Sequence, residues 1–386
     1  MLFATTVAAM TGKVAGLAVV VEFADVKAMH TQAEVDEFFG SIYDYFYEVS
    51  NGRLEYTNVV TPIITLPNEK AYYDNPEKSA LDNAEMLITD ALNILSDMNF
   101  DLSGVTVNGN TVAALNIFYA GGFTREGIYL HSAIYEGGAM VSGIGFERYQ
   151  ITSMDITGSG LPGSFGVVVH ETGHLLMGWP DLYGPEELGR SNSIGDWCIM
   201  ADNRDSLGGT QPNPYFRHLA GWIDTVDITN ALPGTVFAIG ANSDTAFVFR
   251  RNAREAYFIE ALRREGRNRN IPGSGLAIWH IYKGRVALVQ ADGRNDLEDR
   301  VNFGDDTDLF RLGVQTKFNS KTTPAAIWHN RTPSKIAITD ISDSGAVMTF
   351  KIGYEDKAYF WKALLLLLAV LTLAIFFRFL KKFLHS

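Results

Sequence analysis

The sequence has very little of the residues that form several common kinds of site. Cys198 is the only cysteine in 386 residues, so the chain can form no internal disulfide. Lys and Arg number 32 against 44 Asp and Glu, and the net charge is -12. Basic residues form no run outside the arginines at 250–269 and the extreme C-terminus. Because a binder of phosphate backbone needs a basic face, this composition argues against nucleic acid as a partner.

Histidine is also scarce, yet two of the eight histidines stand in one motif. Residues 167–183 read VVVHETGHLLMGWPDLY, in which His170, Glu171 and His174 form an H-E-x-x-H pattern. On a helix this spacing sets both imidazoles on one face, where a single Zn²⁺ can bridge them. The carboxylate of Glu171 can then take a proton from an attacking water and pass it to the leaving amine. The alternative is an accidental match on a buried helix, expected on the order of once in a hundred such chains.

The residues around the motif favour a metal-binding helix. Val167–Val169 would bury its first part, and Leu175–Met177 continue its apolar side. Gly178 accepts a left-handed cap and Pro180 cannot continue a helix, so the helix should end here. The chain then presents Asp181, and metzincin-like enzymes place their third zinc ligand on a chain that doubles back toward the metal.

The run HETGHLLMGWPDLY, followed by SNSIGDWCIM at 191–200, resembles the M6 family of metalloproteases, the immune inhibitor A type. Five further segments resemble the family's landmarks: TGKVAGLAVVVEFADVKA (11–28), YFYEVSNGRLEY (45–56), IPGSGLAIWHI (271–281), VALVQADGRNDLED (286–299) and ITDISDSGAVMTFKI (338–352). One departure is the three residues between His174 and Gly178, where the commoner pattern has two. The resemblance implies a zincin/metzincin-like catalytic domain, Zn²⁺ as cofactor and protein or peptide substrates.

The resemblance also implies a role for Met200. In metzincin-like sites a methionine on a tight turn packs beneath the zinc-binding histidines as an apolar floor, and Met200 is the matching residue; simple core packing is the alternative. Tyr183 or Tyr215 could donate a hydrogen bond to the oxyanion of the tetrahedral intermediate, although aromatic residues near a cleft usually just pack. Cys198 is interpreted as buried packing.

The pattern along the chain predicts a catalytic domain over 11–223, after an unassigned N-terminus at 1–10. Strands and helices are expected, in order, at 14–23 (strand), 32–49 (helix), 54–66 (strands), 79–98 (helix) and 112–119 (strand). This order before the metal helix suits a zincin-like α/β domain. The segment between Gly122 and Gly163 would suit an edge strand over the cleft that pairs with a peptide substrate, or ordinary surface strands and loops.

Residues 224–353 predict a β-rich, sandwich-like module of short strands separated by turns. Within it His280 is interpreted as a strand histidine with a satisfied partner. An acidic cluster follows, made of Asp292, Asn295, Asp296, Asp299, Asp305, Asp306 and Asp308. Oxygen ligands at this density can hold Ca²⁺, but the spacing matches no EF-hand, and a solvated acidic loop is an equal alternative.

The C-terminus predicts a transmembrane helix over 358–380, followed by a short basic tail at 381–386. Ala363–Phe377 carries no charge, and the span reaches full length if Lys362 and Arg378 extend to the two interfaces. The basic tail suits a cytoplasmic flank, with the catalytic domain extracellular or lumenal. A tail anchor with a cytosolic domain and an interfacial helix are the alternatives.

The sequence therefore predicts an α/β (α+β) fold with a zincin-like catalytic domain, a β-rich C-terminal module and one membrane helix. The predicted function is that of a membrane-anchored zinc endopeptidase. A catalytically idle, metalloprotease-like ectodomain that binds a surface partner is the alternative, and Glu171 argues against it. A structural zinc site would need four protein ligands, but no Cys pair or further His lies near the motif.

Overall fold

The computed structural model describes residues 9–122, 131–134, 140–156, 160–183, 193–202 and 209–355, with the backbone alone at 131–134. The chain divides into two compact units. Unit 1 comprises residues 1–188, 195–223 and 265–270, and unit 2 comprises residues 189–194, 224–264 and 271–386. Residues 265–270 thus lie between two segments of unit 2 in sequence but belong to unit 1.

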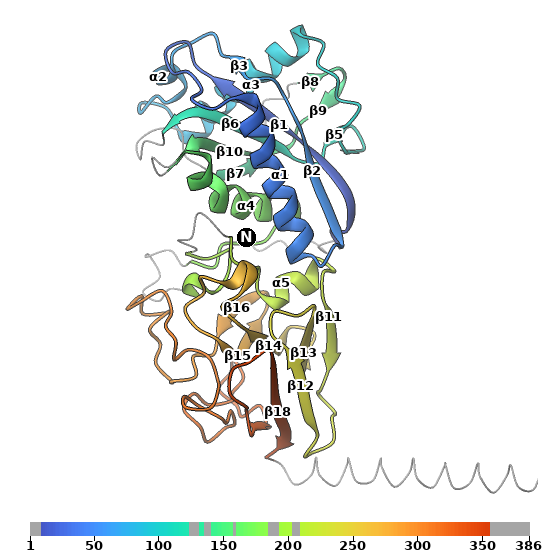
Figure 1. Cartoon of the computed structure of the whole chain (residues 1–386), viewed down its shortest axis with the longest axis vertical. Coiled ribbons are helices and arrows are strands. Elements are labelled where there is room, and N and C mark those ends of the chain that lie inside the picture. The colour runs from blue at the N-terminus through green and yellow to red at the C-terminus, as the bar shows by residue number, and fades with distance from the viewer. Residues whose placement is uncertain are drawn as a thin grey trace, which may run out of the picture. The chain divides into compact units, whose positions relative to one another are not determined.

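Unit 1 is built on a largely parallel sheet (Figure 1). The strand order is β2 (Leu54–Val60), β1 (Gly12–Glu22), β6 (Leu115–Gly122), β10 (Arg148–Asp155) and β7 (His131–Ile134), with β3 (Ile64–Thr65) beside the end of β1. Residues 17–21 of β1 are buried on both faces, as the continuous apolar run predicts for a parallel strand. β7 ends the sheet and runs antiparallel to β10.

Helices cover both faces of this sheet. On one face lie α1 (Gln32–Val49) and α4 (Leu161–Met177), and the ring of Phe38 on α1 stacks at 5.2 Å on Phe118 of β6. On the other face α3 (Ala80–Asp97) shares a core with Leu17 and Ile117. The smaller elements of unit 1 are α2 (Lys70–Tyr73), β4 (Val107–Asn108), β5 (Thr111–Val112), β8 (Met140–Val141), β9 (Ile144–Gly145), η2 (Gly195–Trp197), α5 (Pro214–Leu219) and η3 (Gly266–Asn268).

The helices expected at 32–49 and 79–98 are confirmed as α1 and α3. Each begins at a capping box, in which Thr31 pairs with Glu34 and Ser79 with Asp82. These reciprocal bonds satisfy backbone N–H groups that the first helical turn leaves unpaired. After α1 the chain reverses through Asn51, which has a φ of 55°.

Unit 2 contains two sheets that share one core. The larger has the order β11 (Asp224–Asp227), β13 (Thr245–Asn252), β14 (Glu255–Leu262), β15 (Gly275–Tyr282) and β16 (Arg285–Leu288). The smaller has the order β12 (Val236–Gly240), β18 (Val347–Tyr354) and β17 (Ile336–Thr339). Phe247 of the first sheet and Phe350 of the second pack at 5.4 Å, as the predicted sandwich requires.

His280 has the satisfied partner that its strand position predicts. Its Nε2 lies 3.1 Å from Oε1 of Glu255, a side chain that is 3% exposed. Arg251 donates to the other carboxylate oxygen at 2.7 Å, and the backbone N–H of His329 donates to the first. The buried charge of Glu255 is therefore paired and hydrogen-bonded.

The predicted fold class was wrong in one part. The structure is a mixed α/β protein with several sheets and few helices. Across its described ranges, no helix is both long and apolar enough to cross a membrane. The membrane helix, with the lipid bilayer as partner, is therefore withdrawn; residues 358–380 themselves lie outside the described residues. The physical weakness of the prediction is length, because Ala363–Phe377 falls short of the roughly 20 apolar residues that a bilayer requires.

Candidate metal centre

The H-E-x-x-H motif lies on α4, which is almost wholly buried. The helix ends where the sequence predicts, because Gly178 adopts a left-handed conformation with a φ of 64°. The chain then doubles back, and Leu182 N–H donates to the carbonyl of Met200 at 2.7 Å. This return brings Asp181 beside the helix it has just left.

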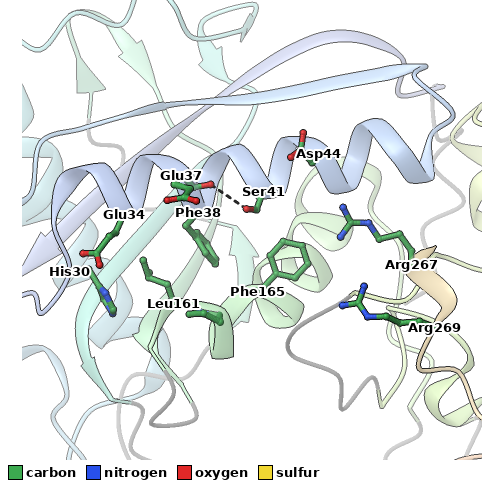
Figure 2. A pocket seen from close by; sticks show the side chains of 11 residues that line it. His30, Glu34, Glu37, Phe38, Ser41, Asp44, Leu161, Phe165, Arg267 and Arg269 are labelled. Carbon is green, nitrogen blue, oxygen red and sulfur yellow. Dashed lines mark hydrogen bonds between the residues drawn. The ribbon is translucent and has the colours of Figure 1, made fainter. Parts of the chain in front are cut away.

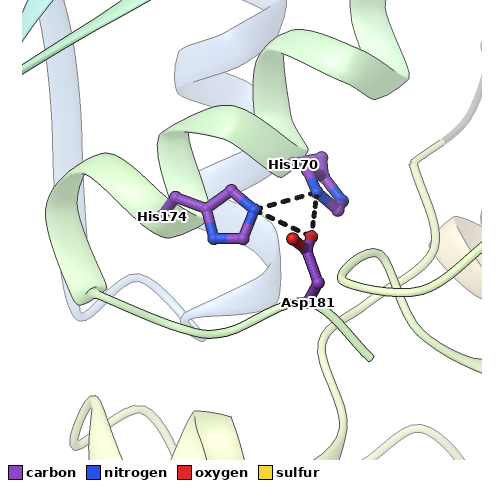
Figure 3. A group of neighbouring side chains, drawn as sticks. All are labelled: His170, His174 and Asp181. Atoms are coloured by element: carbon purple, nitrogen blue, oxygen red, sulfur yellow. Dashed lines mark hydrogen bonds and ion pairs between the residues drawn. The ribbon is translucent and has the colours of Figure 1, made fainter. Parts of the chain in front are cut away.

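His170, His174 and Asp181 meet at one point (Figure 3). The Nε2 atoms of the two histidines are 3.0 Å apart, and each lies 3.0 Å from Oδ1 of Asp181. The two nitrogen atoms come from successive turns of α4, and the oxygen comes from the chain that follows the helix. The residues that the sequence proposed as metal ligands are thus neighbours in space.

The other ring nitrogen of each histidine determines which atoms carry protons. Nδ1 of His170 lies 2.7 Å from the carbonyl of Ile199, and Nδ1 of His174 lies 2.5 Å from the carbonyl of Trp179. A carbonyl oxygen can only accept, so both Nδ1 atoms must donate. In the neutral imidazoles the Nε2 atoms then carry free electron pairs. Two nitrogen electron pairs and a carboxylate oxygen converge, an arrangement that repels itself unless a positive charge lies between them.

The donor set fits zinc. Bonds from zinc to imidazole nitrogen or carboxylate oxygen measure about 2.0–2.2 Å, which sets the ligand atoms of a tetrahedral site about 3.3–3.5 Å apart. The observed separations of 3.0 Å are close to this value. Three protein ligands also leave a fourth position open, as catalytic zinc sites do. The carbonyls of Ile199 and Trp179 are the outer partners that orient metal-binding histidines.

The electrostatics of the group favour a positive charge at this point. Burial alone would raise the pKa of Asp181, but hydrogen bonds and charges from His170 and His174 hold this pKa well below its usual range. Burial alone would lower the pKa of His174, but the hydrogen bond and charge of Asp181, with the charge of Glu171, raise it. Both shifts have the same cause, which is the attraction between the carboxylate of Asp181 and positive charge on the histidines.

Glu171 lies beside this group on α4 and is 8% exposed. Its charge acts on two neighbours, since it raises the pKa of both His174 and Tyr183. Burial and the charge of Asp181 raise the pKa of Tyr183 more strongly. A buried carboxylate thus lies close to the three residues that could hold a metal ion.

The two tyrosines proposed from the sequence differ in their position. The ring of Tyr183 lies nearly parallel to that of His170, with centroids 6.0 Å apart. Tyr183 is 42% exposed, so its ring borders the metal centre without being enclosed. Tyr215 on α5 instead packs against Phe216 at 6.1 Å. Of the two, Tyr183 is the one that contacts a predicted ligand.

Met200 lies directly against the metal helix. A Cβ atom added at Gly173 would stand only 2.6 Å from Sδ of Met200 and 3.2 Å from the ring of Trp179. Gly173 stands between the two histidines in sequence, and any larger residue there would require Met200 to shift away from the helix. Cys198, as expected, is fully buried, and the N–H groups of Met200 and Asn213 point at its sulfur.

A buried polar network joins the opposite face of α4 to the sheet. Gln150 on β10 donates at 2.9 Å to the hydroxyl of Thr172 and also to Asn116 on β6. Asn116 in turn donates to Tyr56 at 3.0 Å and to Asn58 at 2.7 Å. Sequence reasoning missed this network and the two histidine-binding carbonyls. Backbone carbonyls leave no signal in a sequence. Gly173, a glycine inside a helical motif, was a usable signal that another side chain packs closely against the helix.

The acidic cluster of unit 2 also gathers possible ligands. One carboxylate oxygen from each of Asp292, Asp305 and Asp308 lies within 4.8 Å of the others. Arg294 already lies among them, 2.6 Å from Asp292 and 3.0 Å from Asp305. Its guanidinium supplies a positive charge to the same carboxylates, so calcium stays an untested prediction here.

Comparison of the chain with protein-family models and with curated proteins finds no match. The interpretation of the metal centre therefore depends on its own geometry and on the sequence motif.

Proposed function

We propose that this chain is a zinc-dependent endopeptidase of the M6 type that hydrolyses peptide bonds in protein substrates. The observation that carries the proposal is the convergence of His170, His174 and Asp181 on one point, with Glu171 beside it. A structural site would use its fourth position for another protein ligand. The two histidines, one carboxylate and adjacent buried glutamate instead match the requirements of metal-assisted hydrolysis.

Zinc held by His170, His174 and Asp181 would act as a Lewis acid, polarising the scissile carbonyl and favouring ionisation of the attacking water. Glu171 would accept the proton that this water loses, and would then donate it to the nitrogen of the departing amine. The hydroxyl of Tyr183 stands at the border of the site, from which it could donate a hydrogen bond to the developing oxyanion.

The terminal strand β7 supports a peptide as the substrate. It is antiparallel to β10, and among the strands that the structure describes β10 is its one neighbour in the sheet. It also packs against the metal helix α4. A substrate in extended conformation could add to this edge through backbone hydrogen bonds, which would hold its peptide bonds near the metal regardless of side-chain sequence.

The test is cleavage of a labelled, unfolded protein by the purified full chain. Dialysis against a zinc chelator should abolish cleavage, and stoichiometric zinc should restore it. Cleavage that survives complete removal of metal would contradict the proposal. Protein that holds zinc but cuts no unfolded substrate would favour the alternative, a catalytically idle metalloprotease-like protein that binds a partner.

A further inference from the structure

Unit 1 contains a second candidate binding site, away from the metal ligands. A cavity of about 590 Å³ is bounded by α1, the first turns of α4 and residues 267–269 (Figure 2). This volume lies within the range of about 300–1,000 Å³ that is typical of ligand sites. Phe165, which lines the cavity, precedes His170 by five residues on α4, so the two side chains point about 140° apart around the helix. The cavity and the metal centre therefore use different faces of one helix.

The wall that α1 contributes is an acidic stripe. Positions three and four apart lie on one face of a helix, and the stripe runs along the exposed residues Glu34, Glu37, Ser41, Asp44 and Glu48. Glu34 is engaged in capping the helix at Thr31. The carboxylates of Glu37 and Asp44 make no hydrogen bond or ion pair with any side chain that the structure describes. Within the part of the chain that the structure describes, the charges of Glu37 and Asp44 therefore face the cavity without an ion-pair partner.

At one end of this stripe the protein supplies its own basic side chain. Nε of Arg267 lies 2.6 Å from Oε2 of Glu48. The guanidinium also lies over two aromatic rings, 5.5 Å from the centre of Tyr45 and 6.0 Å from that of Phe165. An arginine is thus held by a carboxylate of the stripe together with aromatic faces, a combination that favours a partly desolvated cation.

A carboxylate close to an aromatic ring also occurs nearer the N-terminal end of α1. Asp44 and Glu37 stand one and three turns before Glu48, and Phe38 lies beneath them with its ring at 6.3 Å from Phe165. In Figure 2 Arg267 and Arg269 lie at one end of the cavity, and His30 and Glu34 lie at the other. Glu37 and Phe38 lie between these two ends, whereas Asp44 lies one helical turn from Glu48, the carboxylate that Arg267 binds.

From this repetition we infer that the cavity is a docking site for a basic peptide segment of another protein. An arginine or lysine of that segment occupies the space beside Glu37 and Asp44, in the manner in which Arg267 occupies the space beside Glu48. The aliphatic part of that side chain lies against the small parts of Phe38 and Phe165 that line the cavity, since both rings are otherwise buried. The inference concerns a site outside the metal centre and does not require that the chain cut peptides.

The test measures the affinity of the full chain for two labelled peptides by fluorescence anisotropy, with a zinc chelator present so that neither is cut. The first probe is acetyl-Gly-Leu-Arg-Leu-Gly-amide carrying a fluorophore, and the second has glutamine in place of its arginine. The arginine peptide should bind about tenfold more tightly, and this preference should shrink as salt is added.

Three variants assign the binding to this cavity. Glu37→Gln and Asp44→Asn should each weaken binding of the arginine peptide by about threefold to tenfold and leave binding of the glutamine peptide unchanged. Asp36→Asn is the matched control, because it removes one charge from α1 at a position off the stripe. Circular dichroism confirms that each variant is folded.

Absence of binding to the arginine peptide at about 1 mM would overturn the inference. An equal loss of affinity in Asp36→Asn would do the same, because it would show a general effect of net charge. Glu171→Gln distinguishes this site from the metal centre: it should leave the affinity of the arginine peptide unchanged, whatever it does to cleavage.

Discussion

The hydroxyl of Thr172 accepts a hydrogen bond of 2.9 Å from the side-chain amide of Gln150, and this bond ties the metal helix to the sheet. Thr172 lies midway between His170 and His174 in sequence, about 200° around the helix from each. Its hydroxyl therefore faces the sheet, while the two imidazoles face Asp181 on the other side of the helix. With the bond from Ser164 to the carbonyl of Ser153, it holds α4 against β10 in one orientation about the helix axis.

Replacing Thr172 by valine should weaken both the fold and the metal site. The change leaves a buried donor of Gln150 without this acceptor, which costs about 1–3 kcal/mol of unfolding free energy. Zinc affinity should fall as well, because α4 can then rotate. Denaturant unfolding and competition with a zinc indicator measure the two effects. Thr172→Ser keeps the hydroxyl and should restore both; equal zinc affinity in all three proteins would show that the bond has no part in positioning the ligands.

Gly173→Ala should destabilise the protein although alanine is the better helix former. The new Cβ would stand 2.6 Å from Sδ of Met200, and such overpacking costs about 1–3 kcal/mol. Gly40→Ala on α1 is the control, because a Cβ there meets nothing within 4 Å and should stabilise by about 0.5–1 kcal/mol. Met200→Ala removes a buried side chain and is destabilising by itself, but Gly173→Ala should cost less in the Met200→Ala background than in the wild type. Thermal unfolding of the wild type, the two single variants, the double variant and the Gly40→Ala control measures these differences, and strictly additive effects would contradict the proposed contact.

Unit 2 should lose stability as the pH falls below about 6.5. Burial, opposed in part by Glu255, lowers the pKa of His280 below its ordinary value of 6.5. Burial alone would raise the pKa of Glu255, but hydrogen bonds from His329, Arg251 and His280 lower it below 4.5. Both groups therefore bind protons more readily in the unfolded state. Stability is lost through the histidine as the pH falls through 6.5, and through the glutamate below 4.5.

Hydrogen exchange of the β14 and β15 amides between pH 7.5 and 4 follows this loss. Glu255→Gln should cost about 1–3 kcal/mol at pH 7.5 and should flatten the pH dependence below 4.5. Asp340→Asn is the control, since its ion pair with Lys351 is exposed and should contribute less than about 1 kcal/mol. An unchanged acid profile in Glu255→Gln would contradict the assignment.

Zinc should stabilise unit 1 through Asp181. A ligand that binds the folded state alone raises stability by about 2.7 kcal/mol at a hundred times its Kd. Asp181→Asn keeps the shape of the side chain but removes its charge, so zinc affinity should fall by about a hundredfold. At the same zinc concentration the stabilisation should then shrink from about 2.7 to about 0.4 kcal/mol. Asp292→Asn alters the other carboxylate group and should leave zinc stoichiometry unchanged. Loss of zinc in Asp292→Asn alone would place the metal in unit 2.

Local patterns predicted the elements of unit 1 well because each has a local cause. The capping residues Thr31 and Ser79 begin their helices, and Gly178 ends the metal helix. Asp181, three residues after Gly178, was instead proposed from the place where metzincin-like enzymes carry their third zinc ligand. What depends on distant chain segments was not predictable: the carbonyl of Ile199 reaches His170 from 29 residues away, and Arg267 packs on α1 from more than 200 residues away.

The most direct test of the central claim compares the wild-type chain with Glu171→Gln at full zinc occupancy. Glutamine has the shape of glutamate but cannot accept the proton, so cleavage of an unfolded protein should fall by about 100-fold to 10,000-fold while bound zinc remains at one ion per chain. Equal cleavage by the two zinc-loaded proteins would contradict the assignment of Glu171 as the general base, and with it the proposed peptidase mechanism.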